Sequence, residues 1–300
     1  MWLMSNVVGK WKEFCEWQQR PALIIKKSVE HHRCHTCGEE FQGNYCPQCG
    51  QSAMIGRYSF RKAFLLFLDV WGVGNRGMFR TLRDLILRPG YLIRDYISGM
   101  QSAYFPPFKL LFLMTAFVLF AMVGFSQEKQ AEYDHAFQEE VKDYKETFAK
   151  YDAKKELTES ERSYLAWAKV SYFLLESVYE RTAFFFLAVM FLLTIPLYVF
   201  FRKTPSIPDM RFSELLVAMV YIMSMLMIYL CMYYLIPFID RHFLYAWIVL
   251  PIIPLKQLSG FQWWKTILYV LLAYLGLCLL FYGGMVAAHL ILTYSLVISH

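Results

Sequence analysis

Long apolar runs separated by short polar segments dominate the second half of the chain. The first run, residues 107–125, carries no charge after Lys109. About 20 apolar residues in a helix cross a hydrocarbon layer of roughly 30 Å, so this run predicts a membrane crossing in which Lys109 reaches the headgroups. Further crossings are predicted at residues 182–201, 215–236, 240–255 and 266–298. The expected fold class is therefore an all-α polytopic membrane protein with about five transmembrane helices.

The predicted crossing at residues 240–255 is the weakest of these. Residues 243–255 extend only about 20 Å as a helix, and Pro251 and Pro254 bend it. The crossing either includes residues near Asp240 as well, or the segment is re-entrant. The side of the membrane on which the C-terminus lies depends on this choice.

The last predicted crossing carries small residues at helical spacing. Gly283 pairs with Ala287 and Gly284 with Ala288, and such small-xxx-small pairs let another helix approach closely. They are candidate contacts for a homo-oligomer.

An acidic segment, residues 126–181, separates the first two crossings, with thirteen Asp and Glu against nine Lys and Arg. Apolar residues at alternating spacings of four and three predict one helix here, and Thr158 with Glu161 predicts the capping box of a second. We expect a helical hairpin outside the membrane. Its apolar stripe either packs on the neighbouring helix or binds a partner.

The segment before the first crossing, residues 57–106, is basic and amphipathic. Arginines and apolar residues recur at spacings of three and four, which is typical of helices lying on a membrane surface. The arginines expected to contact anionic lipids are Arg76, Arg80, Arg83, Arg88 and Arg94. Nucleic acid is the competing partner, but aromatic and aliphatic residues are too dense here for a freely solvated basic patch.

Residues 1–30 predict a second amphipathic helix ending near Pro21. Trp11 and Phe14 share its apolar stripe, and Lys10 and Lys12 flank it. The helix either anchors the chain at the membrane interface or packs on the metal module described next.

Residues 31–52 contain two Cys-x-x-Cys-Gly units, in the sequence CHTCGEEFQGNYCPQCGQ. Two cysteines at this spacing can turn both sulfurs towards one ion, and four thiolates suit tetrahedral Zn²⁺. The ligands predicted for this zinc ribbon are Cys34, Cys37, Cys46 and Cys49. Iron or disulfides are the alternatives, while the neighbouring histidines are expected to be surface residues because four thiolates already complete the site.

Composition and charge agree with these assignments. The chain is 57% hydrophobic, above the 45–50% of ordinary soluble domains, and its N-terminus has no signal-peptide pattern. Residues 1–106 hold fourteen Lys and Arg against eight Asp and Glu, and the loops 202–212 and 256–265 are also basic. Because cytoplasmic loops carry excess positive charge, we expect a cytoplasmic N-terminus and ribbon, with the C-terminus on the other side.

The ribbon motif followed by TLRDLILRPGYLIRDYISGMQSAYFPPFKLLF and several crossings resembles a family of bacterial inner-membrane proteins of unknown function with an N-terminal Cys₄ zinc ribbon. The resemblance covers residues 34–125. It implies a multi-pass location in the bacterial inner (plasma) membrane and a metal-binding N-terminus, and it implies no activity. The thirty residues before Cys34 depart from that pattern.

Catalytic motifs do not occur in the sequence, so we expect no enzyme. The candidate intramembrane polar residues are Glu214, at the start of the third crossing, and His289, inside the fifth. Three functions follow. The first is a non-catalytic adaptor or regulator whose ribbon docks a cytoplasmic protein, the second is a transporter or lipid-handling protein, and the third is a membrane-embedded enzyme.

Overall fold

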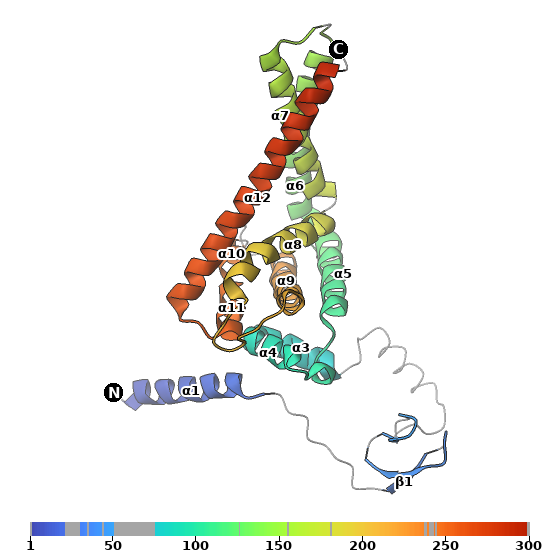
Figure 1. Cartoon of the computed structure of the whole chain (residues 1–300), viewed down its shortest axis with the longest axis vertical. Helices are drawn as coiled ribbons and strands as arrows, with labels where there is room; N and C mark the ends of the chain where they lie inside the picture. Colours follow the sequence, from blue (N-terminus) through green and yellow to red (C-terminus); the bar gives the residue numbers. More distant parts are fainter. Residues whose placement is uncertain are drawn as a thin grey trace. The chain divides into compact units, whose positions relative to one another are not determined.

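The computed structural model describes residues 2–21, 31–34, 36–43, 45–50, 76–125, 127–154, 156–180, 182–236, 239, 243 and 245–298. Residues 57–75 of the predicted interfacial segment, His35 and the Asp240-Arg241 turn lie outside this set. The described residues form helices and one small two-stranded sheet (Figure 1), which confirms the all-α fold class.

The elements follow one another in this order: α1 (Trp2–Gln19), β1 (His31–Arg33), β2 (Glu40–Gln42), α3 (Arg76–Leu87), α4 (Pro89–Ile97), η1 (Gln101–Ala103), α5 (Pro107–Phe125), α6 (Gln127–Asp152), α7 (Glu159–Glu180), α8 (Thr182–Phe201), α9 (Phe212–Leu235), α10 (Ala246–Val249), α11 (Ile252–Ser259) and α12 (Trp263–Ile298).

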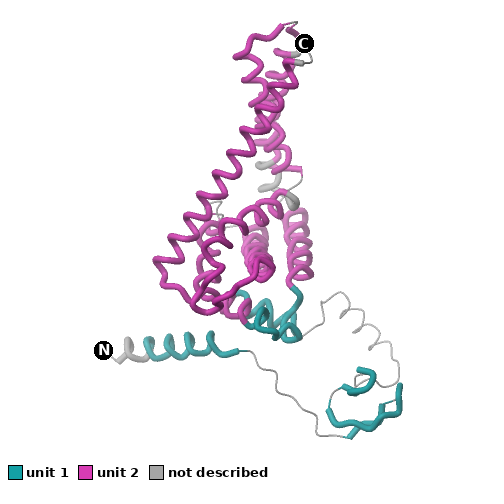
Figure 2. Tube along the Cα trace, in the orientation of Figure 1, with its two compact units in different colours: residues 1–87, 95–106 teal, residues 88–94, 107–300 magenta. Residues whose placement is uncertain are grey.

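The chain divides into two compact units (Figure 2). Unit 1 comprises Met1–Leu87 and Asp95–Pro106, and unit 2 comprises Arg88–Arg94 and Pro107–His300. Unit 1 holds the cysteine cluster, and unit 2 holds most of the apolar helices.

The centre of unit 2 is α9. Its residues from Ala218 to Met227 are all buried, and 61% of its most apolar stretch is buried, against 28% for α5 and 11% for α12. α5 and α8 pack on α9, and α12 packs on α8 (Figure 1). A helix that is apolar on all sides and central in its bundle needs no polar face, which explains the uniform sequence of α9.

Three helices are long and apolar enough to cross a membrane: Gln101–Phe125, Phe212–Leu235 and Trp263–Val297. α7 and α8 pass the same test only together, and they are bent by 109° with respect to each other. Three to four of the described helices could therefore cross. In the described part of the predicted crossing at residues 240–255, α10 and α11 form a shorter apolar stretch, Ala246–Ser259, which is below spanning length.

One end of unit 2 is held together by contacts between the start of α4 and the end of α11. The amide of Gly90 donates to Gln257 Oε1 (2.9 Å). In return, Arg94 Nη2 donates to the carbonyls of Gln257 and Leu258. Each helix thus satisfies backbone groups that the other leaves without an intrahelical partner, and the arginine lies at the negative end of the α11 dipole.

The loop between α8 and α9 joins the same end. Arg94 Nη2 also donates to Ser206 Oγ (3.0 Å), and the amide of Ser206 donates to the carbonyl of Ser259 (3.2 Å). The short α10–α11 segment therefore returns the chain to the end at which α9 begins.

The predicted hairpin lies at the opposite end of these helices. Phe137 of α6 stacks on Tyr179 of α7, with ring centroids 3.6 Å apart, so the apolar stripe packs on its neighbouring helix. The amide of Thr158 donates to Glu161 Oε2 (3.1 Å), and the amide of Glu161 approaches Thr158 Oγ1 (3.4 Å), as the capping box predicts. Lys154 binds the same carboxylate, and this hydrogen bond raises the pKa of Lys154.

The close approach of α4 to α11 predicts that Gly90→Ala destabilises unit 2. An added methyl group would collide with Pro254 O and Gln257 Cβ and lie 2.7 Å from Leu258 N. Overpacking of this kind lowers the free energy of unfolding by about 1–3 kcal/mol. The measurement is a denaturant titration in detergent, followed by the loss of helical signal. The matched control is Gly124→Ala in α5, where an added methyl group meets nothing within 4 Å. Equal stability of the two variants would contradict the packing described.

Candidate metal centre

The two Cys-x-x-Cys-Gly units fold into nearly identical turns. The amide of Gly38 donates to the carbonyl of Cys34, and the amide of Gly50 to that of Cys46, both at 2.9 Å. Both glycines adopt the left-handed conformation, with φ of 78° and 74°, which a side chain would strain. The repeated spacing therefore produces the same local geometry twice.

A short hairpin brings the two turns together. β1 and β2 pair antiparallel with His32 opposite Phe41, and the amide of Cys34 donates to the carbonyl of Glu39 (2.8 Å). Phe41, Cys34 and Cys46 are buried and form the only apolar cluster of this module among the described residues. A core this small does not hold a fold without a cross-link or a metal.

The four sulfur atoms have the spacing that a tetrahedral ion requires. All four lie within 4.8 Å of one another, with Cys34 and Cys49 at 3.4 Å and Cys37 and Cys46 at 3.5 Å. Bonds of about 2.3 Å to a central ion separate tetrahedral sulfurs by about 3.8 Å. All four cysteines are free thiols, and together they form a candidate metal site.

Hydrogen bonds within the cluster make the thiols unequal. The backbone amide of Cys37 lowers the pKa of Cys34 to about 6. For Cys37, the backbone amide of Glu39 acts to lower the pKa, but burial and the neighbouring thiols raise it to about 12. The cluster therefore favours one thiolate and opposes a second one beside it until a cation compensates the charge. Metal binding must release protons from the other thiols.

The described histidines near the cluster contact other residues of the hairpin. His31 Nε2 contacts Gln42 Nε2 across the hairpin (2.5 Å), and the ring of His32 lies 5.8 Å from that of Phe41. Neither belongs to the set of residues that could hold the ion.

The five arginines expected at the lipid surface differ in their surroundings. Arg83 is 55% exposed and forms an ion pair with Asp84 (2.6 Å), and Arg80 is half-buried. The side chain of Arg76 lies outside the described part. For Arg88 the expectation is wrong, because its side chain is buried. Arg94 is half-buried and donates to carbonyls at the end of α11, so its contact with headgroups stays a prediction.

The side chain of Glu214 caps the start of its own helix. Its Oε2 accepts a hydrogen bond from the amide of Arg211 (2.8 Å), directly before α9 begins at Phe212. An acidic residue in the first turn also interacts favourably with the helix dipole. The contact gives Glu214 a structural role at the helix end.

The side chain of His289, in α12, contacts α7. Its Nε2 lies 3.2 Å from the carbonyl oxygen of Ser163 and 3.1 Å from that residue's hydroxyl, and its ring stacks on Trp167 at 4.6 Å. At 1.5 Å per residue, His289 is about 39 Å along α12 from Trp263, farther than a hydrocarbon layer of roughly 30 Å. His289 lies within the candidate span Trp263–Val297, so its position inside the fifth crossing stays a prediction.

Comparison with known proteins gives a match to a family model. A family described as "Protein of unknown function (DUF3667)" matches residues 75–119, which cover α3, α4 and part of α5. No curated protein and no solved structure matches the chain. The match lies within the residues that carry the resemblance, and together with the cysteine cluster and apolar helices it supports a membrane protein of a family of unknown function.

We predict that replacing one of the four cysteine ligands causes loss of the ion. Cys34→Ser should lower metal content per chain to near zero and unfold the ribbon, because three thiolates and so small a core cannot replace the fourth bond. The measurement is elemental analysis of the purified full chain, with limited proteolysis of the ribbon. Cys15→Ser, in α1 and outside the cluster, is the matched control and should keep the metal. Full retention in Cys34→Ser would refute the site.

A structural role for His289 predicts a change in stability alone. His289→Phe keeps an aromatic ring on Trp167 but loses the bond to Ser163, which contributes about 0.5–1.5 kcal/mol. Denaturant titration should show this loss. Ser163→Ala removes only the hydroxyl and leaves the carbonyl, so its effect should be smaller. Unchanged stability in His289→Phe would contradict the assignment.

Proposed function

We propose that this protein is a membrane-anchored, non-catalytic adaptor whose zinc ribbon docks a cytoplasmic protein. The observation that carries the proposal is a four-thiol module in unit 1 on a chain whose other unit is a bundle of apolar helices. The module holds an ion to keep its shape, and the helices hold the chain in the bilayer.

Zinc is the proposed ion because of the ligand set. Four cysteines in tetrahedral array with no open position are typical of structural zinc sites, and thiolates disfavour magnesium and calcium. Cys34 and Cys46 are buried while Cys37 and Cys49 are exposed, so one side of the site faces inward and the other faces outward. A closed site of this kind supports docking rather than catalysis.

A cytoplasmic ribbon is supported by the way basic segments gather at one end of unit 2. Residues 88–94, the 202–212 loop and the end of α11 are joined through Arg94, Ser206 and Leu258. All three segments are basic or adjoin basic loops, and positive charge favours the cytoplasmic side. The hairpin and the end of α12 then lie outside the cell membrane, and the ribbon lies where thiols stay reduced.

Exposed apolar residues on unit 1 support an additional attachment to the membrane surface. α3 exposes Phe79 and Ile86 beside Arg83, and α1 exposes Val8 and Trp11. Apolar side chains next to cations suit the interface of an anionic bilayer. The end of α1 also contacts α3, because Gln18 Nε2 donates to the carbonyl of Leu87, which favours the interfacial anchor over packing on the ribbon.

Other functions have less support. Glu214 and His289, the residues on which a transport path or an embedded active site would depend, make helix-end and helix-packing contacts. A homo-oligomer through α12 is compatible with this proposal, because an added methyl group at Gly283 or Gly284 meets nothing within 4 Å.

The adaptor proposal predicts a specific protein adduct at the ribbon surface. A photo-crosslinking amino acid in place of Tyr45, which is 68% exposed, should capture one cytoplasmic protein from native membranes of cells expressing the full chain. Combining it with Cys34→Ser should abolish the adduct, because docking needs the folded ribbon. Mass spectrometry identifies the product.

The matched control places the same amino acid at Tyr164, an exposed tyrosine of the hairpin. It should not capture that protein. The same adduct from both positions, or an adduct that survives Cys34→Ser, would contradict docking by the ribbon. A partner from the outer compartment would contradict the orientation.

A further inference from the structure

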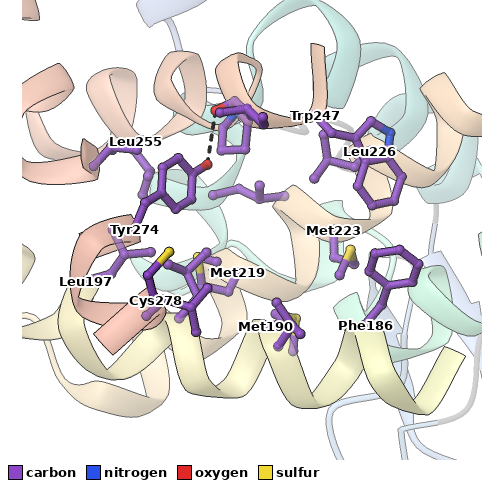
Figure 3. Close-up of a pocket in the computed structure, with 17 residues that line it drawn as sticks. Phe186, Met190, Leu197, Met219, Met223, Leu226, Trp247, Leu255, Tyr274 and Cys278 are labelled. Atoms are coloured by element: carbon purple, nitrogen blue, oxygen red, sulfur yellow. Dashed lines mark hydrogen bonds between the residues drawn. The ribbon is translucent and has the colours of Figure 1, made fainter. Parts of the chain in front are cut away.

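Unit 2 contains an apolar pocket of about 420 Å³ between α8, α9, the α10–α11 segment and α12 (Figure 3). Side chains from all four segments face one another across it, among them Met190, Met219, Met223, Trp247 and Tyr274. This pocket is separate from the ribbon and independent of the adaptor function proposed above.

The lining offers almost no hydrogen-bonding group to a ligand. Tyr274 donates its hydroxyl to the carbonyl of Ile248 (3.0 Å), and the indole nitrogen of Trp247 is fully buried. The other side chains that line the pocket end in carbon or sulfur. Water is a poor occupant because it needs two to four polar partners, so the lining selects a hydrocarbon.

Size and flexibility fit a chain rather than a compact molecule. A methylene group occupies roughly the volume of a water molecule, about 30 Å³, so the pocket accommodates roughly a dozen carbons. Three of its lining residues are methionines, whose unbranched thioethers adapt to irregular and mobile ligands. An empty cavity of this size would forfeit dispersion contacts along its whole lining.

The depth of the pocket in the bilayer indicates where a bound hydrocarbon chain would come from. Val270 and Cys278 of α12 line it, and they lie about 10 Å and 22 Å along the helix from Trp263. In a hydrocarbon layer of roughly 30 Å, this interval surrounds the middle of the bilayer. Ile248 and Cys278 are both lining residues and exposed, so the pocket adjoins the surface that membrane lipid covers.

We propose that the pocket between α8, α9, α10–α11 and α12 is a lipid site that takes one acyl chain of a membrane phospholipid. The headgroup remains outside the pocket, because the single indole N–H of Trp247 is the only side-chain N–H or O–H donor without a partner that the lining offers it. A bound chain would fill the space beside α9.

The test uses the full chain in phosphatidylcholine vesicles that contain a phosphatidylcholine with a diazirine in one acyl chain. After illumination, peptide mapping should find adducts on Met190, Met219 and Met223 at roughly tenfold the yield on Leu279, because a chain held in a packed site stays in contact longer than bulk lipid. Leu279 is exposed on α12 and does not line the pocket. Equal or lower yields on the methionines would overturn the proposal.

Filling the pocket provides the second arm. Met223→Trp should reduce the adducts on Met190 by roughly tenfold, because the indole occupies the volume of the chain, and Leu279→Trp should leave them unchanged. Cys278→Phe, at the exposed edge, should act like Met223→Trp and covers the case in which the core variant does not fold. Adducts on Met190 that persist in both pocket variants would overturn the proposal.

A free diazirine fatty acid in phosphatidylcholine vesicles distinguishes the two sources of a hydrocarbon chain. Stronger labelling of Met190 by the phospholipid at equal content supports the proposal as stated. Labelling by the fatty acid alone would overturn the assignment to a phospholipid.

Discussion

The mutual capping of α4 and α11 is the constraint on which the arrangement of unit 2 depends. Gly90 brings the two helices so close that each supplies hydrogen bonds to the other's end. Arg94, a half-buried cation, donates to carbonyl oxygens and to Ser206 Oγ. Because Arg94 reaches two segments more than a hundred residues away in sequence, it fixes which helix ends lie together.

The metal cluster obeys a different and purely local constraint. Its geometry follows from two turns closed within five residues each and from a hairpin of three residue pairs. Such a module forms without help from the apolar helices, provided that an ion offsets the entropy of ordering so short a segment. Stability of the ribbon and stability of the helical body should therefore respond to different perturbations, the first to chelators and the second to changes in packing.

Sequence reasoning succeeded where the determinant is local. The Cys-x-x-Cys-Gly spacing, the capping box at Thr158 and the apolar runs of α5, α9 and α12 all express interactions within a few turns. It did not identify the partners of Arg94 and His289, because these partners lie 163 and 126 residues away. Periodicity places an arginine on a helix face but carries no information about a distant carbonyl. The contact of Gln257 with α4 could not be predicted from the sequence for the same reason.

The interruption between α10 and α11 connects the doubtful fourth crossing with the pocket. Pro251 at the break and Leu255 in the first turn of α11 both line the cavity, as do Trp247 and Ile248 of α10. Leu250 and Pro251 keep right-handed helical dihedrals, so Ala246–Ser259 forms one shorter apolar stretch. This stretch returns the chain to the end where α9 begins, and beside α9 it borders a space that the chain's own side chains do not fill.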